Sequence, residues 1–177
     1  MLLPRMGVKE LLQGRWLGHP LHPAIVHVPT GLWPAALVFD VLSLLGGGSN
    51  VAVRLAFWCA AVGLAGAVVA VGPGLADWWD IKPRKPARKL GVWHMTLNLT
   101  AAAIFAIDLL LRLAQGLDAR SVSIAVIVLC ALGNVIVFVS GYLGGRMVYE
   151  HGISVARMSK KKWREIAEEG KAHLPAE

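Results

Sequence analysis

Four long apolar segments dominate this sequence and restrict what it can fold into. They cover residues 24–45, 51–75, 92–113 and 122–148, and crossing a hydrocarbon core of about 30 Å takes roughly 20 helical residues. Hydrophobic residues make up 56% of the chain and charged residues 16%, unlike a soluble domain. Lipid admits only helices or closed barrels, and the segments lack the alternation of barrel strands. The sequence therefore predicts an all-α polytopic membrane protein, a four-helix up-down transmembrane bundle forming one domain over residues 1–177.

The distribution of Lys and Arg predicts the orientation of this bundle. Basic residues gather before the first span, between the second and third spans, and after the fourth: Arg5, Lys9, Arg15, Lys82, Arg84, Lys85, Arg88, Lys89, Arg157, Lys160, Lys161, Lys162 and Arg164. The opposite side carries only Arg54, Arg112 and Arg120. The positive-inside rule then places both termini in the cytoplasm. This bias accounts for most of the net charge of +7, so we expect the partner of these residues to be the lipid bilayer and not nucleic acid.

Both ends of the chain show short amphipathic patterns. Val8, Leu11 and Trp16 repeat at helical spacing near the start, and Trp163 and Ile166 do so near the end. Such segments lie in the interface between membrane and water. We therefore expect short interfacial helices at both termini, with residues 156–177 forming a cytoplasmic amphipathic tail.

Histidines and other polar residues concentrate at the cytoplasmic face once the spans are threaded through a bilayer. The set comprises His19, His22, His27, Asp77, His94, Asn98, Arg146, Tyr149 and His151. His27 and His94 each lie a turn or less inside the start of a span, so the topology places them at equal depth. Polar groups within a membrane avoid lipid and face the bundle interior, so these two imidazoles are candidates to share a ligand.

The histidines of the entry segment, Gly18 to Pro23, each precede a proline. His19 precedes Pro20 and His22 precedes Pro23, and a residue before proline is disfavoured in helical conformation. We expect an extended entry segment with Pro23 in the first turn of the first span. Pro29 removes one hydrogen bond from that span.

Small residues and a second polar group complete the pattern within the spans. The second span carries a stripe of small residues, Ala56, Ala60, Gly63, Ala67, Ala70 and Gly74, and the fourth carries Gly141 and Gly145. Such stripes favour close helix packing, or alternatively leave a slot for a flat ring. On the opposite side of the membrane lie Asp40, Arg54, Asp108 and Arg112, which we expect to form a structural ion-pair group.

The His-Pro-Leu-His-Pro entry at 19–23 and the Gly-Tyr-Leu-Gly-Gly exit at 141–145 carry a family resemblance. Together with Asp77, His94 and Asn98 they make the chain resemble a bacterial membrane family known as domain of unknown function, number twenty-two thirty-one. The resemblance implies a four-helix bundle in the bacterial inner membrane, joined in some members to a Rieske-type iron–sulfur domain. The two cysteines here, Cys59 and Cys130, both lie within spans and do not supply ligands for such a cluster. The resemblance implies a redox function but assigns no specific activity.

Haem binding is the most specific functional hypothesis that these residues support. A b-type haem needs axial ligands from facing helices, and cations near its propionates. We expect His27 and His94 as iron ligands, Asp77 or Asn98 as the partner that fixes a ring tautomer, and Arg88, Lys89 or Arg146 beside the propionates. The function would be electron transfer near the cytoplasmic face, with membrane or redox proteins as partners.

Two other functions remain open. A transition-metal site or permease would use His19, His22, His151 and Asp77, although the middles of the spans are nearly all apolar. Alternatively, the polar residues lock helix ends together in a non-catalytic accessory subunit of a larger membrane complex. No phosphate-binding loop, paired nucleophile and base, or zincin motif occurs in the sequence, so enzymes are the least supported class.

Overall fold

The computed structural model describes residues 6–45, 50–155, 165 and 167–170. Its regular structure in this part of the chain is entirely helical. Four helices are long and apolar enough to cross a membrane: Leu21–Leu45, which is divided into α2 (Leu21–Ile25) and α3 (His27–Leu45), then α4 (Asn50–Trp79), α5 (Pro86–Gln115) and α6 (Ile124–Tyr149). The structure confirms the prediction of an all-α chain with four membrane-spanning segments.

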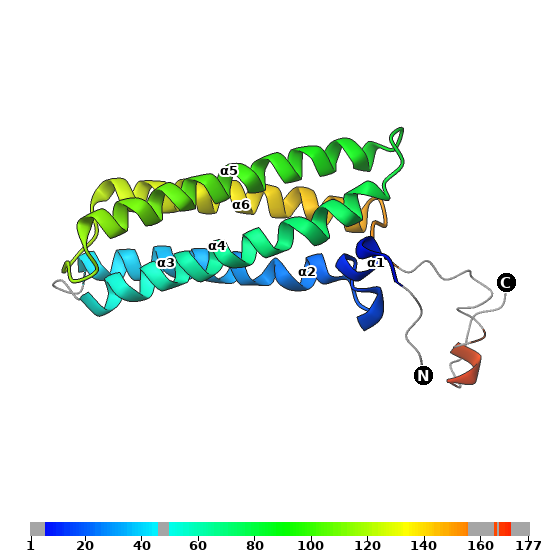
Figure 1. The fold of residues 1–177 in the computed structure, drawn as a ribbon, viewed down its shortest axis with the longest axis horizontal. Coiled ribbons are helices and arrows are strands. Elements are labelled where there is room, and N and C mark those ends of the chain that lie inside the picture. The colour runs from blue at the N-terminus through cyan, green and yellow to red at the C-terminus, as the bar shows by residue number, and fades with distance from the viewer. Residues whose placement is uncertain (1–5, 46–49, 156–164, 166, 171–177) are drawn as a thin grey trace.

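The long helices form two antiparallel hairpins that lie side by side (Figure 1). Helix α3 packs along α4, and α5 packs along α6, while α4 with α5 and α3 with α6 join the two hairpins. One end of the bundle holds the N-terminal segment, the α4–α5 connection and the end of α6, and we call it the basic end. The other holds the ends of α3 and α5, the start of α4 and the connection 116–123, and we call it the far end.

The N-terminal segment lies against the basic end. Helix α1 (Val8–Leu12) is followed by a 3₁₀ turn, η1 (Arg15–Leu17), and Lys9 forms an ion pair with Asp80 just after α4. Val8, Leu11, Trp16 and Leu17 are more than half exposed, and apolar side chains exposed beside a membrane span suit the interface. The first expected terminal helix is thus present, whereas the expected tail, residues 156–177, falls almost entirely outside the described residues.

The expectation of an extended entry segment is wrong for His22. Pro20 has extended backbone angles (φ −61°, ψ 126°), but His22 lies inside α2, one residue before Pro23. Proline is tolerated in the first helical turn because its missing N–H has no intrahelical partner there, and this outweighs the disfavour for the preceding residue. The expected position of Pro23 in the first turn is confirmed.

The bounds of the third span also differ from the prediction. Helix α5 begins at Pro86, six residues before the expected start at residue 92. Proline is pre-organised for the first helical position, and the basic side chains that follow can reach water from a helix near the surface. Arg88 and Lys89 are therefore helical residues rather than part of the loop.

Two glycines in the middle of the bundle leave space that aromatic rings of neighbouring helices occupy. A Cβ atom on Gly63 would lie 2.6 Å from the Trp33 ring, and one on Gly133 would lie 2.6 Å from the Phe105 ring. Trp33 and Phe105 are themselves stacked, with ring centroids 4.0 Å apart and planes at 9°. The small residues of α4 thus serve close packing, as predicted. In α6 the close contact is made by Gly133, which the prediction did not name, whereas a Cβ atom on the predicted Gly141 would meet nothing within 4 Å and one on Gly145 would meet only Tyr149 of the same helix.

Candidate functional site

Two histidines meet inside the bundle toward its basic end. His22 of α2 and His94 of α5 are both half-buried, and their ring centroids lie 6.2 Å apart with planes at 81°. Each ring is oriented by a backbone carbonyl of another helix, Ala70 of α4 for His22 and Ser140 of α6 for His94. Both hairpins therefore contribute to this histidine pair: one through α2 and α4, the other through α5 and α6.

His94 is held by hydrogen bonds at both ring nitrogens. Its Nδ1 lies 2.8 Å from the Ser140 carbonyl oxygen, which can only accept, so Nδ1 carries the hydrogen. Its Nε2 then accepts from the Asn98 amide at 3.0 Å. The Ser140 hydroxyl lies 3.0 Å from Nδ1 and also donates to the His94 carbonyl at 3.1 Å. The network fixes the tautomer with its lone pair on Nε2. Ser140, and not the expected Asp77 or Asn98, orients the ring through Nδ1, while Asn98 binds the nitrogen that a ligand would take.

His22 is held at one nitrogen only. Its Nδ1 lies 3.0 Å from the Ala70 carbonyl oxygen and must donate to it. No hydrogen bond to its Nε2 occurs within the described residues. A Cβ atom on Gly74 would lie 2.8 Å from the imidazole, and one on Gly144 would lie 3.2 Å from His94. Glycines on α4 and α6 thus give the two rings their room, and His22 presents an available lone pair.

The structure does not bring together the expected ligand pair of His27 and His94. His27 is exposed at the start of α3, and its Nδ1 lies 3.3 Å from the Ala24 carbonyl oxygen. The equal depth inferred from sequence assumed one continuous helix from residue 24. The break at Val26 separates α2 from α3, and it is His22 whose ring faces His94.

The other candidate metal ligands are dispersed. His19 is exposed and lies 3.1 Å from the Pro20 carbonyl oxygen, while Asp77 and His151 are half-buried. The part of the chain that the structure describes contains no group of three or more His, Cys, Asp or Glu residues that could hold a metal ion. A bare zinc or copper ion usually takes three or four protein ligands.

The three expected propionate partners lie at the basic end. Arg88 donates to the Ile81 carbonyl at 2.6 Å and stacks 3.9 Å over the Trp78 ring. Lys89 is exposed, and Arg146 forms a bidentate pair with Glu150 at 2.7 and 2.8 Å. Both arginines are therefore already engaged, and their role beside a cofactor stays a prediction.

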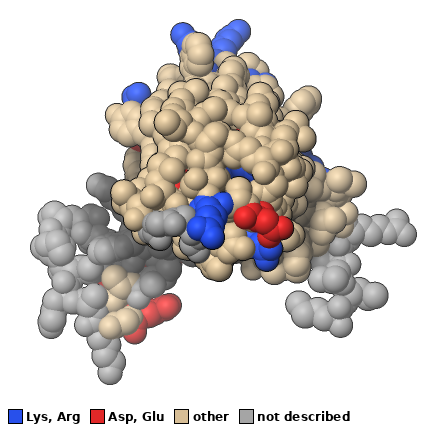
Figure 2. Space-filling model, turned by 90° about the vertical axis from the view of Figure 1, so that its left-hand side faces the viewer, with Lys and Arg blue, Asp and Glu red and all other residues tan. Residues whose placement is uncertain are grey.

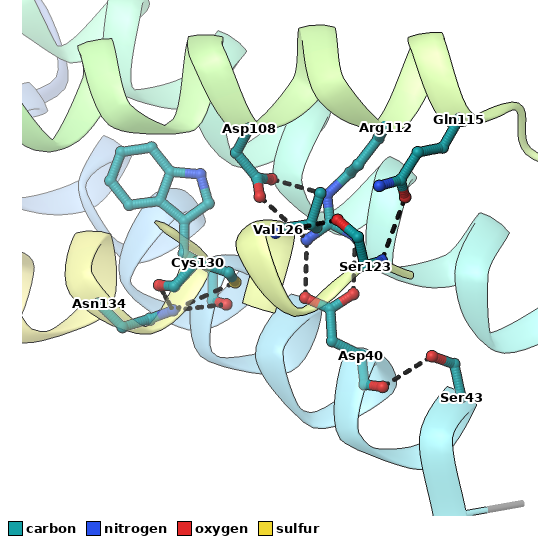
Figure 3. A network of polar contacts seen from close by, with 10 residues as sticks. Asp40, Ser43, Asp108, Arg112, Gln115, Ser123, Val126, Cys130 and Asn134 are labelled. Carbon is teal, nitrogen blue, oxygen red and sulfur yellow. Dashed lines mark hydrogen bonds and ion pairs between the residues drawn. The ribbon is translucent and has the colours of Figure 1, made fainter. Parts of the chain in front are cut away.

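A second polar cluster, the far-end triad, consists of Asp40, Asp108 and Arg112 (Figure 3). The Arg112 guanidinium binds both Asp40 oxygens at 2.7 Å and the Asp108 carboxylate at 2.6 Å. All three side chains have no exposed surface. The sequence predicted this ion-pair group, except that Arg54 pairs instead with Asp118 on the surface. Figure 2 looks onto this end, where a few charged side chains lie on an otherwise uncharged surface.

Sequence reasoning missed Ser140, which joins α6 to His94. The residue is fully buried, and its hydroxyl and carbonyl both contact the imidazole or backbone of His94. The available signal was a lone serine within an apolar run, Val137 to Val139 before it. Intramembrane polar groups rarely face lipid, which marks such a serine as an inward-facing partner.

Comparisons with known proteins identify only a family. No curated protein matches the chain, and no solved structure matches it. The family model described as "Predicted membrane protein (DUF2231)" matches residues 18–157, a range that contains the entry histidines, all four long helices and both polar clusters. The chain therefore belongs to the DUF2231 family of membrane proteins.

Proposed function

We propose that this protein is a haem-binding, redox-associated membrane subunit in which His22 and His94 provide the axial ligands of a b-type haem. The observation that carries the proposal is the pair of imidazoles, each anchored through Nδ1 to a backbone carbonyl and 6.2 Å apart between centroids. An Nδ1–H bond to a carbonyl is the usual arrangement that orients a metal-binding histidine and leaves Nε2 to bind. The proposal replaces His27 with His22.

The donor set fits haem better than a bare metal ion. A porphyrin supplies four nitrogen ligands, so the protein needs to add no more than two, which is the number of imidazoles that meet here. The two rings, whose centroids lie 6.2 Å apart, would hold the group between them.

Haem would supply one-electron redox chemistry, and the residues of this chain would hold and orient it. His22 has its Nε2 available, whereas His94 would exchange its 3.0 Å contact with the Asn98 amide for the iron. Arg88, Lys89 and Arg146 lie at the same end of the bundle and would compensate propionate charge. The basic end would face the cytoplasm of a bacterial inner membrane, which places electron transfer at that face.

The test is a reduced-minus-oxidised visible spectrum of the detergent-purified protein, with haem quantified as the pyridine haemochrome. We expect nearly one haem per chain in the wild type and in His27→Ala, and loss of haem in His22→Ala and His94→Ala. His94→Met is the matched folding control, because thioether is also an iron ligand and raises the reduction potential. A colourless wild type after expression with ample haem, or full haem content in both His22→Ala and His94→Ala, would refute the proposal.

A second candidate function is that of a non-catalytic accessory subunit. It is supported by the complete hydrogen bonding of His94, which ties α5 to α6 through Ser140 without any ligand. In that case the wild type is colourless, and cross-linking in native membranes should capture a defined redox or other membrane partner. His94→Ala would then lower thermal stability without a spectral change.

A further inference from the structure

The far-end triad contains more negative than positive charge. Asp40 and Asp108 bring two carboxylates and Arg112 brings one guanidinium, all without exposed surface. Within the described residues, the charged groups acting on Asp108 and Arg112 are the other members of the triad alone. Fully ionised, the cluster would carry one uncompensated negative charge inside the bundle.

Among the residues that the structure describes, the elements around the triad supply no compensating cation. Helix α6 contributes the Cys130 thiol, which faces Asp40 and is neutral in its ordinary state. Helix α4 packs against α3, and its buried residues beside Arg54, namely Val53 and Ala56, are apolar. The nearest basic side chain of α4, Arg54, is about half exposed and pairs with Asp118 at the surface. The excess charge therefore has to be removed within the triad itself.

A bound proton removes the excess charge most simply. An isolated ionised carboxylate is so costly in an apolar medium that such groups take up a proton instead. Two carboxylates that share one site behave in the same way, because their mutual repulsion favours protonation of one of them. The same reasoning holds more strongly within a bilayer, where water is absent.

The contact distances identify which carboxyl group takes the proton. Asp40 receives two equal hydrogen bonds of 2.7 Å from Arg112 and is the natural ionised partner. Asp108 receives one short bond at Oδ2, 2.6 Å, while its Oδ1 lies 3.4 Å from the guanidinium, beyond the usual N–H···O range of about 2.7–3.2 Å. Oδ1 of Asp108 is the least engaged oxygen of the triad.

We propose that the far-end triad is a proton-binding site, in which Asp108 binds one proton at Oδ1 at neutral pH. Binding converts the Asp108 carboxylate to a carboxylic acid and changes the charge of the cluster from −1 to 0. The neutral form leaves Asp40 and Arg112 as a balanced pair.

A further buried polar group lies beside Cys130, the residue of α6 that faces Asp40. Asn134 lies one helical turn from Cys130, and its amide nitrogen donates to the Cys130 and Trp33 carbonyls at 2.9 and 3.1 Å. Its Oδ1 is buried and has no hydrogen-bond donor in the part of the chain described. Buried acceptors are nearly always satisfied, so Asn134 Oδ1 is an open acceptor beside the polar groups drawn in Figure 3.

Infrared spectroscopy of the wild-type protein in lipid nanodiscs tests the proposal directly. The C=O stretch of a protonated carboxylic acid is separate from the amide bands, and we expect one such band at pH 7. Asp108→Asn should remove this band while the protein stays folded, because asparagine mimics the neutral acid. Asp108→Glu should keep the band at a shifted frequency, which covers the case in which the asparagine variant fails to fold.

Two matched controls identify the residue that carries the band. Asp118→Asn replaces an exposed carboxylate, and Asp77→Asn replaces a half-buried one in α4 at the basic end. Both variants should retain the full band of the wild type. Absence of a protonated carboxyl band in the wild type at pH 7, or its survival unchanged in Asp108→Asn, would overturn the proposal.

Discussion

The two polar clusters of this bundle are built in opposite ways. The histidine pair at the basic end is half-buried, and it is tied to backbone carbonyls. The far-end triad consists of ionisable side chains that bind one another and are completely buried. The histidine pair leaves a nitrogen lone pair available, whereas the triad leaves only one weakly engaged oxygen. The contrast teaches that polar residues in a membrane bundle serve different ends according to whether their partners are backbone or side chain.

The largest expected effect comes from removing the arginine of the triad. Arg112→Met leaves the buried Asp40 carboxylate without its counter-charge, which should lower the free energy of unfolding by about 3–5 kcal/mol. Arg54→Met, at the exposed pair with Asp118, is the matched control and should cost about 0–1 kcal/mol. Thermal unfolding in one detergent compares the two variants.

A triple variant sharpens this prediction. Replacing all members together, as Asp40→Asn, Arg112→Met and Asp108→Asn, removes every charge and should recover most of the loss, because buried ion pairs are often replaceable by neutral groups. Equal melting of Arg112→Met and Arg54→Met would show that the triad stabilises the bundle no more than a surface ion pair does.

A smaller loss of stability is expected at the histidine pair when Gly74, which makes room for the His22 ring, is replaced by a larger residue. The Cβ atom of Gly74→Ala would lie 2.8 Å from the His22 ring, so the imidazole or α4 must shift, at a cost of about 1–3 kcal/mol. Gly141→Ala, where nothing lies within 4 Å, is the control and should melt like the wild type. If haem is bound at His22, Gly74→Ala should also lower the haem content, and an unchanged melting temperature would contradict the close packing of His22 against α4.

The smallest expected effect concerns Asp80, which ties the N-terminal segment to the basic end. Hydrogen bonds from Lys9 and Gln13 hold the pKa of Asp80 below its ordinary value. Because the folded pKa is lowered, the interaction stabilises the protein above the unfolded pKa of about 4 and is lost as pH falls through the folded value. The side chain is about half exposed, so Asp80→Asn should cost less than about 1 kcal/mol at pH 7.

Melting curves at two pH values check this assignment. The difference between wild type and Asp80→Asn should be small at pH 7 and should vanish at a pH below the folded pKa of Asp80. A difference that grows on acidification would contradict the sign of the linkage.

The sequence was sufficient to predict the four spans, because the length of an apolar segment determines whether it crosses a bilayer. It was also sufficient for the triad, since Asp108 and Arg112 are one helical turn apart and Asp40 is an intramembrane charge that must find a partner. The partner of His94 could not be predicted in the same way. His22 and His27 are five residues apart and therefore lie on different faces of a helix, and hydropathy does not report which of these faces meets α5. Likewise, no sequence pattern indicates that the Ala70 and Ser140 carbonyls orient the histidine rings.

The stacked Trp33 and Phe105 rings lie in the middle of the bundle and come from different hairpins, Trp33 from α3 and Phe105 from α5. Both side chains are almost completely buried, and each ring occupies a glycine notch on a neighbouring helix. Each hairpin thus contributes one ring and one glycine to the same contact, so the two hairpins cannot slide along each other without unstacking the rings.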